Sequence, residues 1–196
     1  MTIFLIIGRP GAGKSTAINI FKNFLLKESN KEIIILDDFD LLYNWYHNDK
    51  LGYFKPYKSS GFEIINYEIY NKALKEIIQK LQEIHENEPN KIIFVEFSRD
   101  NYISAFSLIP EEILQKAHII YIYSDLNKCL ERNELRESTP RYVPYEVISK
   151  NDDFNDLHSL YENRLIIINN QKDISSLKNE LEFNNQIKEI IKQLKT

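Results

Sequence analysis

A glycine-rich turn near the start of the chain constrains its fold more than any other feature. The segment from Gly8 to Ser15 reads Gly-Arg-Pro-Gly-Ala-Gly-Lys-Ser and fits the pattern G-x-x-x-x-G-K-[ST]. An apolar run, Ile3–Ile7, precedes this turn, and an amphipathic segment from about Lys14 to Lys27 follows it. A buried strand, a glycine-rich turn and a helix in this order are the context in which the pattern forms a phosphate-binding loop.

Each residue type in this loop has a physical role. The glycines allow a tight turn and bring backbone N–H groups close to phosphate oxygens. We expect Lys14 to face solvent and to bring its charge to the β- and γ-phosphates, and Ser15 to ligate Mg²⁺. The positive end of the helix dipole points at the same anion. The residues expected to bind nucleotide are Gly8, Arg9, Pro10, Gly11, Ala12, Gly13, Lys14, Ser15 and Thr16.

The composition indicates a globular protein without a membrane span. The chain has 196 residues, 43% hydrophobic and 28% charged, which suits one domain with a sizeable core. No apolar run approaches the ~18 residues of a membrane helix, and no basic segment precedes the first apolar run as in a signal peptide. One cysteine, Cys129, excludes an intramolecular disulfide and predicts a reducing, cytoplasmic location. The net charge of −4 argues against a wholly basic nucleic-acid binder.

Short apolar runs alternate with amphipathic segments along the chain. The expected strands are Ile3–Ile7, Glu32–Leu36, Lys91–Phe97, His118–Tyr123 and Arg164–Ile168. The expected helices are about Lys14–Lys27, Phe62–His85, Tyr102–Leu108, Pro110–Lys116, one from Ser124 or Asp125 to Arg136, a short one from Pro144, and Ile174–Lys195 with a break considered near Phe183–Asn185. This alternation predicts an α/β fold with a doubly wound, mostly or wholly parallel sheet. Ligands of such a sheet bind beyond the carboxyl ends of the strands.

Two further patterns concern packing. In the helix expected at Phe62–His85, the residues expected to face inward are Ile65, Ile69, Leu74, Ile77, Ile78 and Leu81. The stretch Phe39–Tyr70 is rich in aromatic residues, and Gly52, Pro56 and Gly61 are expected to break it into loops and short helices. Aromatic rings can stack on a base or a sugar, but most such rings pack in a core.

Carboxylates stand at the ends of two of the expected strands. Glu96 ends the run Ile-Ile-Phe-Val, in the position where a carboxylate holds Mg²⁺ directly or through water. Asp37 and Asp38 follow the strand Glu32–Leu36, and one of them could accept the proton of an attacking hydroxyl. The alternative role is a cap of the next helix. The sequence does not choose between the pair, although Asp37 is marginally favoured because it is nearer the strand.

Three arginines follow the strand His118–Tyr123. Arg132 and Arg136 are four residues apart and therefore share one face of a helix, and Arg141 comes shortly after them. Such arginines can bind a transferring phosphoryl group when a lid closes. The alternative is a solvated helical face paired with Glu131 or Glu137. The segment Glu137–Val143 has charges and prolines but little apolar content, so we expect it to be poorly packed without ligands.

Taken together, these residues resemble the P-loop kinases of nucleosides, nucleotides and polynucleotide ends. Glu96-Phe-Ser-Arg99 is similar to the Glu-Arg-Ser element of deoxynucleoside kinases, with one extra residue between the glutamate and the arginine. In those kinases the glutamate serves the metal and the arginine binds near the acceptor. The segment Cys129–Val147 resembles their lid. Those kinases use a glutamate base after the second strand, whereas Asp37-Asp38 is closer to polynucleotide kinases and some small-metabolite kinases.

The resemblance implies a three-layer P-loop NTPase fold with a five-stranded parallel sheet in the order 2-3-1-4-5 and a helical lid. Residues 1–196 would form one kinase domain, with an acceptor-site insertion at about 39–70 and the lid at about 125–150. ATP is the implied donor, with Mg²⁺, and its adenine lies near the lid helix and Asn169-Asn170. From the residues and the resemblance together, we expect the catalytic residues to be Lys14, Asp37, Asp38, Arg132 and Arg136. Arg132 also binds the nucleotide, Ser15 and Glu96 the metal, and Asp37, Arg99 and Arg141 the acceptor.

The expected activity is therefore an ATP- and Mg²⁺-dependent transfer of the γ-phosphate to a hydroxyl or phosphate of a nucleoside, nucleotide or related small molecule. One alternative is a kinase that acts on a nucleic acid, guided by Lys50, Lys55, Lys58 and Arg99. Another is a GTPase-like switch. Asp49–Gly52 matches D-x-x-G without a preceding strand, and Asn170–Asp173 lacks the lysine that follows the asparagine of the guanine-binding pattern. The oligomeric state stays open, with a homodimer among the alternatives.

Overall fold

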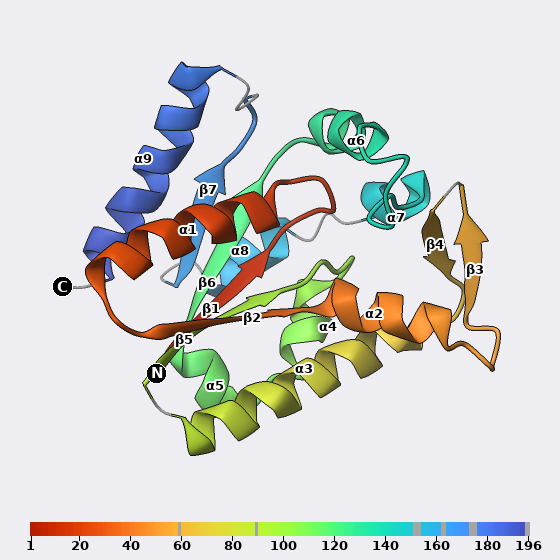
Figure 1. The fold of residues 1–196 in the computed structure, drawn as a ribbon, viewed down its shortest axis with the longest axis horizontal. Coiled ribbons are helices and arrows are strands. Elements are labelled where there is room, and N and C mark those ends of the chain that lie inside the picture. The colour runs from red at the N-terminus through yellow and green to blue at the C-terminus, as the bar shows by residue number, and fades with distance from the viewer. Residues whose placement is uncertain (59, 89, 151–153, 162–163, 173–175, 195–196) are drawn as a thin grey trace.

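A five-stranded parallel sheet forms the centre of the computed structural model (Figure 1). The structure describes residues 1–58, 60–88, 90–150, 154–161, 164–172 and 176–194. The strands of the sheet, in spatial order, are β2 (Glu32–Asp37), β5 (Lys91–Glu96), β1 (Thr2–Ile7), β6 (Ala117–Tyr123) and β7 (Leu165–Asn169). Every neighbouring pair is parallel. Counted among the strands of this sheet alone, the order is 2-3-1-4-5.

A second, two-stranded sheet differs from the expectation. The antiparallel strands β3 (Phe54–Tyr57) and β4 (Gly61–Ile64) form a hairpin within the aromatic stretch, where loops and short helices were predicted. In the chain, β3 and β4 lie between β2 and β5. The strand predicted as the third of the main sheet therefore carries the label β5. Strands of four residues are too short to show a clear alternation of apolar and polar side chains, and Pro56 favours the prediction of a loop.

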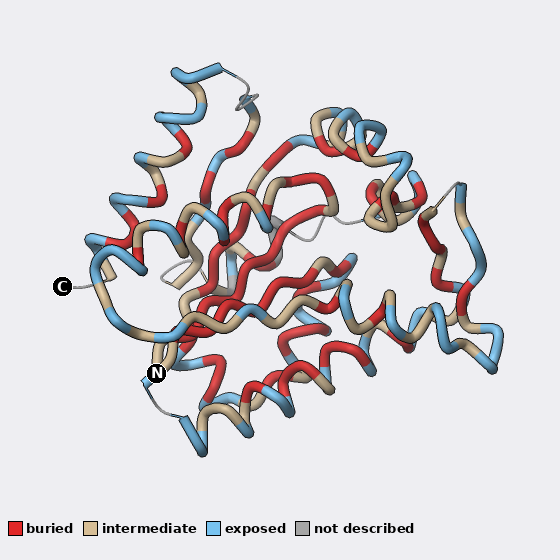
Figure 2. Tube along the Cα trace, viewed as in Figure 1, coloured by how far each residue is buried: buried red, intermediate tan, exposed pale blue. Residues whose placement is uncertain are grey.

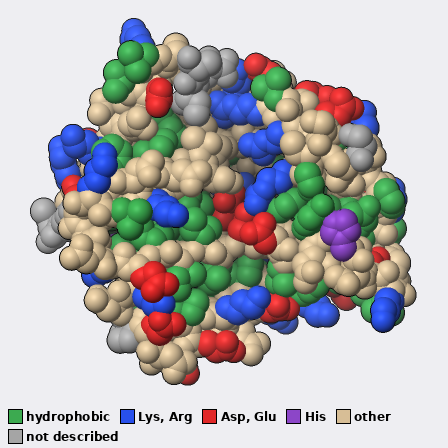
Figure 3. Space-filling view, in the orientation of Figure 1, with side chains coloured by type: hydrophobic (Ala, Val, Ile, Leu, Met, Phe, Trp, Pro, Cys, Tyr) green, Lys and Arg blue, Asp and Glu red, His purple; other side chains and the backbone are tan. Residues whose placement is uncertain are grey.

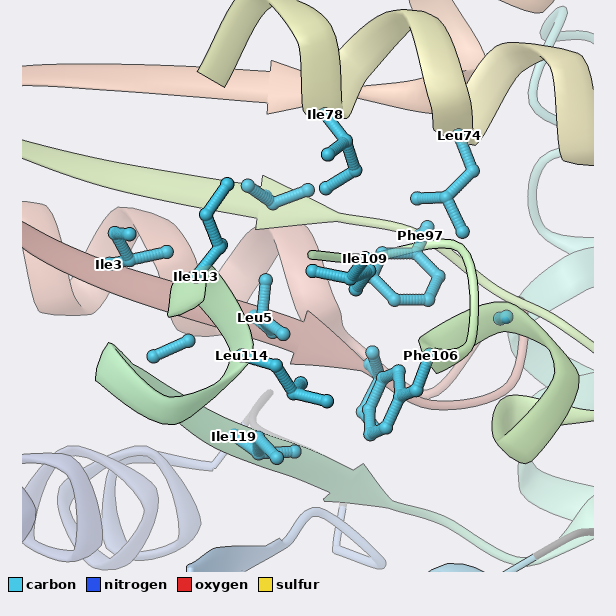
Figure 4. Packing of buried hydrophobic residues seen from close by; sticks show 14 of the residues in the cluster. Ile3, Leu5, Leu74, Ile78, Phe97, Phe106, Ile109, Ile113, Leu114 and Ile119 are labelled. Carbon is cyan, nitrogen blue, oxygen red and sulfur yellow. The ribbon is translucent and has the colours of Figure 1, made fainter. Parts of the chain in front are cut away.

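Helices cover both faces of the main sheet. The helices of the structure are α1 (Lys14–Glu28), α2 (Asp38–His47), α3 (Glu68–Asn87), α4 (Tyr102–Phe106), α5 (Glu111–Lys116), α6 (Leu126–Glu134), α7 (Tyr145–Ser149), α8 (Phe154–Tyr161) and α9 (Leu177–Gln193). Side chains alternate along a strand, so β1 serves two cores. Ile3 and Leu5 pack with residues of α3, α4 and α5, as Figure 4 shows, whereas Phe4 and Ile6 pack with residues of α1 and α9. The three inner strands are accordingly buried and the edge strands less so (Figure 2).

A third core holds together the part of the molecule that extends beyond the sheet. Leu42 of α2, Phe54 and Phe62 of the hairpin, and Ile69 of α3 pack together, with further aromatic rings around them. The Tyr46 and Phe62 rings are stacked, with centroids 5.1 Å apart. Most of the aromatic residues of Phe39–Tyr70 therefore build a core that fixes α2 and the hairpin beside α3.

Several predicted boundaries were wrong. The helix predicted from Phe62 begins at Glu68, and Ile65, which was expected to face inward, is 54% exposed. The other predicted inward residues of this helix are buried. Helix α9 runs unbroken through 183–185, since Phe183 faces the core at the same helical spacing as Ile187 and Ile190. The predicted ends of this helix, Ile174 and Lys195, lie outside the described residues. No helix among the described segments is long and apolar enough to cross a membrane.

Candidate active site

The phosphate-binding loop lies between the end of β1 and the start of α1. Gly13 has φ +99°, and a side chain there would meet the Asn170 amide nitrogen at 2.3 Å. Gly8 has φ +142°, and a side chain there would meet the Ile122 carbonyl oxygen at 2.5 Å. Both positions therefore require glycine because of the backbone angle and because of the neighbouring chain. The loop is held in place by β6 and by the segment after β7.

Lys14 differs from the expectation that it faces solvent. Its side chain is buried, with 7% of the residue exposed. Its ammonium group donates to the carbonyl oxygens of Gly8 and Arg9 at 3.2 and 3.1 Å and to the Ser98 hydroxyl at 2.6 Å. Burial lowers the pKa of Lys14, against the raising effect of Glu96. The Lys14 side chain therefore folds over its own loop, where the loop carbonyl oxygens and Ser98, which follows β5, hold it.

Ser15 and Glu96 form a pair suited to a magnesium ion. The Ser15 hydroxyl donates to Glu96 Oε1 at 3.0 Å, and Glu96 is 5% exposed at the end of β5. Burial raises the pKa of Glu96, against the lowering effect of Lys14. Mg²⁺ beside a nucleotide takes one or two protein oxygens and completes its shell with water and phosphate oxygens. The pair fits that requirement, and the described residues hold no cluster of three or more His, Cys, Asp or Glu ligands.

Asp38, the first residue of α2, and Arg99, which follows β5, form a buried ion pair. Arg99 Nη1 lies 2.5 Å from Asp38 Oδ2, and the two residues are 5% and 7% exposed. The other terminal nitrogen, Nη2, donates to the Tyr70 carbonyl oxygen at 2.7 Å. Burial raises the pKa of Asp38, against the lowering effect of Arg99. Oδ1 of Asp38 accepts no hydrogen bond from a described residue, so it is available to a ligand.

Asp37 has a different role, although it is the next residue. Its Oδ1 accepts from the Phe39 backbone N–H at 2.9 Å, which caps α2. Its Oδ2 accepts from Arg141 at 2.7 Å, and Arg141 also reaches Asp40 at 3.3 Å. The Arg141 guanidinium lies over the Phe39 ring, 4.2 Å from its centroid. Both oxygens of Asp37 are thus engaged within the protein.

Arg132 and Arg136 do not share a helical face as expected, because α6 ends at Glu134 and Arg136 lies in the turn after it. Arg132 donates to the Ser124 hydroxyl at 3.0 Å and to the Asn170 carbonyl oxygen at 2.9 Å, and it lies beside the phosphate-binding loop. The Arg136 guanidinium has no hydrogen-bond or ion-pair partner among the described residues. Burial and then Arg141 lower its pKa. Arg136 is half-buried, and a cation without a partner among the described residues is placed to receive an anion.

The segment 137–143 is more tightly packed than expected. Tyr142 is 4% exposed, and its ring stacks on that of Tyr57 in the hairpin at 5.7 Å. Lys58 of the hairpin pairs with Glu137 at 3.3 Å. The low apolar content of the segment did not predict this packing, because one residue, Tyr142, makes the buried contact with the hairpin. The segment that follows α6 therefore lies against the β3–β4 hairpin in this structure.

A cavity of about 440 Å³ connects these elements. The predicted site residues that line it are Pro10, Gly11, Gly13, Lys14, Ser15, Asp37, Asp38, Glu96, Arg99, Arg136 and Arg141. Those that do not are Gly8, Arg9, Ala12, Thr16 and Arg132. Arg9, for example, directs its guanidinium to the Ile148 carbonyl oxygen at 2.8 Å. Acidic and basic side chains meet near the middle of the face shown in Figure 3, beside a group of hydrophobic side chains.

Three residues support the loop through contacts that the sequence analysis did not predict, although it named Asn170 as a neighbour of the adenine. The buried Tyr102 hydroxyl accepts from the Gly8 N–H at 2.8 Å. Ser98 donates to the Gly8 carbonyl oxygen at 2.8 Å in addition to accepting from Lys14. The Asn170 amide donates to the Ala12 carbonyl oxygen at 2.7 Å. Ser98 lies within the Glu96–Arg99 element, so its place near the loop is readable from the sequence. No local pattern indicates that Tyr102 contacts Gly8, which is 94 residues away.

The chain adopts the three-layer P-loop NTPase fold, and solved kinase structures share it. The APS kinase of Mycobacterium tuberculosis in complex with AMPPNP and APS aligns with a TM-score of 0.59 over 100% of this chain and 98% of that one, at 13% identity. The shikimate kinase of Acinetobacter baumannii in complex with shikimate aligns at 0.56 over 100% and 95%, at 12% identity. A gluconokinase of Sinorhizobium meliloti aligns at 0.55 over 98% and 94%, at 11% identity. No family model matches the chain, and no curated protein matches it in sequence.

Proposed function

We propose that this protein is an ATP- and Mg²⁺-dependent kinase that transfers the γ-phosphate to a small molecule of the nucleoside or nucleotide type or a related hydroxyl compound. One observation carries the proposal. A single cavity is lined by Lys14 and Ser15 of the phosphate-binding loop and also by Asp38 and Arg99. A phosphate donor and an acceptor bound there would meet at the carboxyl edge of the sheet, where ligands of such sheets bind.

The residues that bind ATP and Mg²⁺ have separate roles. Backbone N–H groups of the loop and Lys14 bind the phosphates, with Lys14 exchanging its contacts to loop carbonyls for contacts to phosphate oxygens. Ser15 and Glu96 hold Mg²⁺, which supplies charge neutralisation when it is bound. Arg136 binds the transferring group, since its guanidinium is unpaired among the described residues and faces the cavity. Arg132 keeps the loop and the segment after β7 together.

On the acceptor side, Asp38 is the general base. Oδ1 of Asp38 is open to a ligand, and its raised pKa favours proton acceptance at the reaction step. Asp37 is unsuited to this task because both of its oxygens are engaged. Residues 39–70 form the acceptor side and residues 125–150 a lid that closes on it. The complexes of the neighbours with AMPPNP and APS and with shikimate support a nucleotide donor and a small acceptor.

The nucleic-acid alternative receives less support from the geometry. Lys55 pairs with Glu63 at 2.8 Å and Lys58 with Glu137. Arg99 is buried and paired with Asp38. A backbone of phosphates needs a track of available cations, and these three are already neutralised.

The GTPase-like alternative also receives little support. Asp49 accepts from the N–H groups of Leu51 and Phe54 in the turn before β3, and it does not line the cavity. Asn170 is 4% exposed and its amide bonds the loop carbonyl of Ala12. The fourth residue of that pattern, Asp173, lies outside the described residues.

The test is ATP turnover by the purified protein with a panel of acceptors, measured as ADP release. We expect turnover that requires Mg²⁺ and an acceptor, and a loss of turnover of about 10³-fold or more in Lys14→Ala, because the charge it brings to the phosphates acts at the transition state. Lys27→Ala removes an exposed lysine of the same helix and should leave turnover unchanged. Equal turnover in wild type and Lys14→Ala would refute the kinase assignment.

A further inference from the structure

We infer that Arg9 is a positioning residue that fastens α7 to the phosphate-binding loop, and that it makes the order of one cavity wall depend on the occupancy of the loop. The inference rests on the proposed kinase function and adds a residue to it. Arg9 belongs to the loop but does not line the cavity. Its guanidinium group and its backbone carbonyl oxygen contact two different parts of the site.

The guanidinium group of Arg9 bonds the C-terminal end of α7, which lies beside the loop in Figure 1. Nη1 donates to the Ile148 carbonyl oxygen at 2.8 Å and lies 3.5 Å from that of Ser149, and Arg9 is 7% exposed. The last carbonyl groups of a helix have no partner within it, and a basic side chain can satisfy them. The contact therefore ties the loop to a helix that is 139 residues away in the chain.

The position of α7 depends on tertiary contacts, because a helix of five residues is not stable by itself. The segment before it is held by the Asn133 amide, which accepts from the Val143 N–H at 3.1 Å and donates to the Val143 carbonyl oxygen at 2.9 Å. Ile148 is fully buried in the core that α1 and α9 share. Arg9 holds the last turn, so its substitution leaves these other two anchors in place and loosens the C-terminal end of α7.

α7 and the residues beside it form one wall of the cavity. Val143, Pro144, Val147 and Lys150 line it. Lys150 directly follows α7, and its ammonium group lies 5.4 Å from the centroid of the Tyr67 ring at the start of α3. α7 thus faces α3 across the cavity, and a loosened α7 would leave this wall without a fixed position.

The backbone of Arg9 contacts the lysine of the loop. The Arg9 carbonyl oxygen accepts from the Lys14 ammonium group at 3.1 Å and from the Ala12 N–H at 3.1 Å. In the proposed reaction Lys14 leaves this oxygen for phosphate oxygens, and the loop N–H groups bind the same phosphates. A loop ordered by phosphates holds the Arg9 backbone more firmly, and the Arg9 side chain transmits this order to α7. ATP would therefore order the wall that an acceptor meets.

Hydrogen exchange of residues 147–150 without nucleotide tests the anchor. Arg9→Met should raise their exchange rate by about tenfold, because the closed state loses a hydrogen bond from a charged group. Arg164→Met is the matched control, since Arg164 bonds the carbonyl oxygens of Leu114 and Ala117 at the end of α5 in the same way. The control should leave exchange at 147–150 unchanged. Equal exchange in wild type and Arg9→Met would overturn the anchor.

The link to the loop is tested with AMPPNP and Mg²⁺ at saturation, after titration calorimetry has given the affinity of each variant. In wild type, AMPPNP should slow exchange at residues 147–150 severalfold. In Arg9→Met this slowing should be lost, while residues 11–15 of the loop still respond. Arg9→Lys keeps a donor for the same carbonyl oxygens and should restore part of the response. An arginine with a merely structural role would not change how α7 responds to a nucleotide.

The outcomes separate the role of Arg9 from the proposed function. Bound AMPPNP that slows the loop of wild type but not residues 147–150 would overturn the link, and this comparison needs no variant, so it decides the link even if Arg9→Met does not fold. Equal slowing in wild type and Arg9→Met would overturn the role of Arg9. Failure of wild type to bind AMPPNP would refute the proposed function and with it the link, whereas the nucleotide-free comparison still decides the anchor.

Discussion

Asp37 and Arg141 join the end of β2 to the segment after α6 through an ion pair of 2.7 Å. The Asp37 side chain is 8% exposed and the Arg141 side chain 39% exposed, so the pair lies at the border between the cavity and solvent. The same carboxylate caps α2 through its other oxygen. One side chain thus fixes the first turn of the acceptor side and holds the lid segment against it.

This arrangement predicts that the two neighbouring aspartates respond differently to the same substitution. Asp38→Asn should lower kcat by about 10²-fold or more with ATP affinity within a few-fold, because it removes the proton acceptor. Asp37→Asn should lower kcat by much less, since asparagine caps a helix about as well as aspartate. Steady-state kinetics and ATP titration check this. Equal losses in both variants would contradict the assignment of Asp38, provided that chemical unfolding shows both proteins folded.

A second prediction concerns the energy of the Asp37–Arg141 contact. A double-mutant cycle with Asp37→Asn and Arg141→Gln should give a coupling of about 0.5–1 kcal/mol in the free energy of unfolding, since the pair is partly exposed and screened. Hydrogen exchange of residues 137–143 should become faster in each variant. The exposed pair Lys55–Glu63 provides the control cycle, with a smaller coupling and no effect on exchange in the lid.

A third prediction concerns pH. Burial raises the pKa of Asp38 above its ordinary value of 3.8, against the lowering effect of Arg99. A general base acts only when deprotonated, so kcat/KM should fall as the pH decreases through a value above 3.8. This acid limb should be absent from the residual activity of Asp38→Asn. An unchanged limb in that variant would assign it to another group, such as Glu96, whose pKa burial also raises.

The fourth prediction concerns Tyr102, whose hydroxyl group accepts a hydrogen bond from the phosphate-binding loop. Tyr102→Phe removes the acceptor of the Gly8 N–H and leaves that buried donor unpaired, so the free energy of unfolding should fall by about 1–3 kcal/mol. ATP affinity should fall as well, because Gly8 also accepts from Lys14 and Ser98. Tyr46→Phe, in the third core, is the control and should leave ATP affinity unchanged. The measurements are denaturant unfolding and ATP titration.

The pattern of neighbouring residues in the sequence was enough to predict the central sheet and the phosphate-binding loop. The apolar run Ile3–Ile7, the loop from Gly8 to Ser15 and the helix after it lie together in the chain, so their pattern is readable without tertiary contacts. Strands that alternate with helices can form few topologies, because crossovers are right-handed and connections short. The convergence of Glu96 and Asp37 on the loop followed from that topology.

The rest depended on partners that are remote in the chain. Asp37 and Asp38 are adjacent and chemically identical, and they differ because Arg141 reaches one and Arg99 the other. The burial of Lys14 likewise depends on Ser98, which belongs to another strand connection. The charge and hydrogen bonding of a group reflect the atoms within a few ångströms of it, and the folded chain alone brings those atoms together.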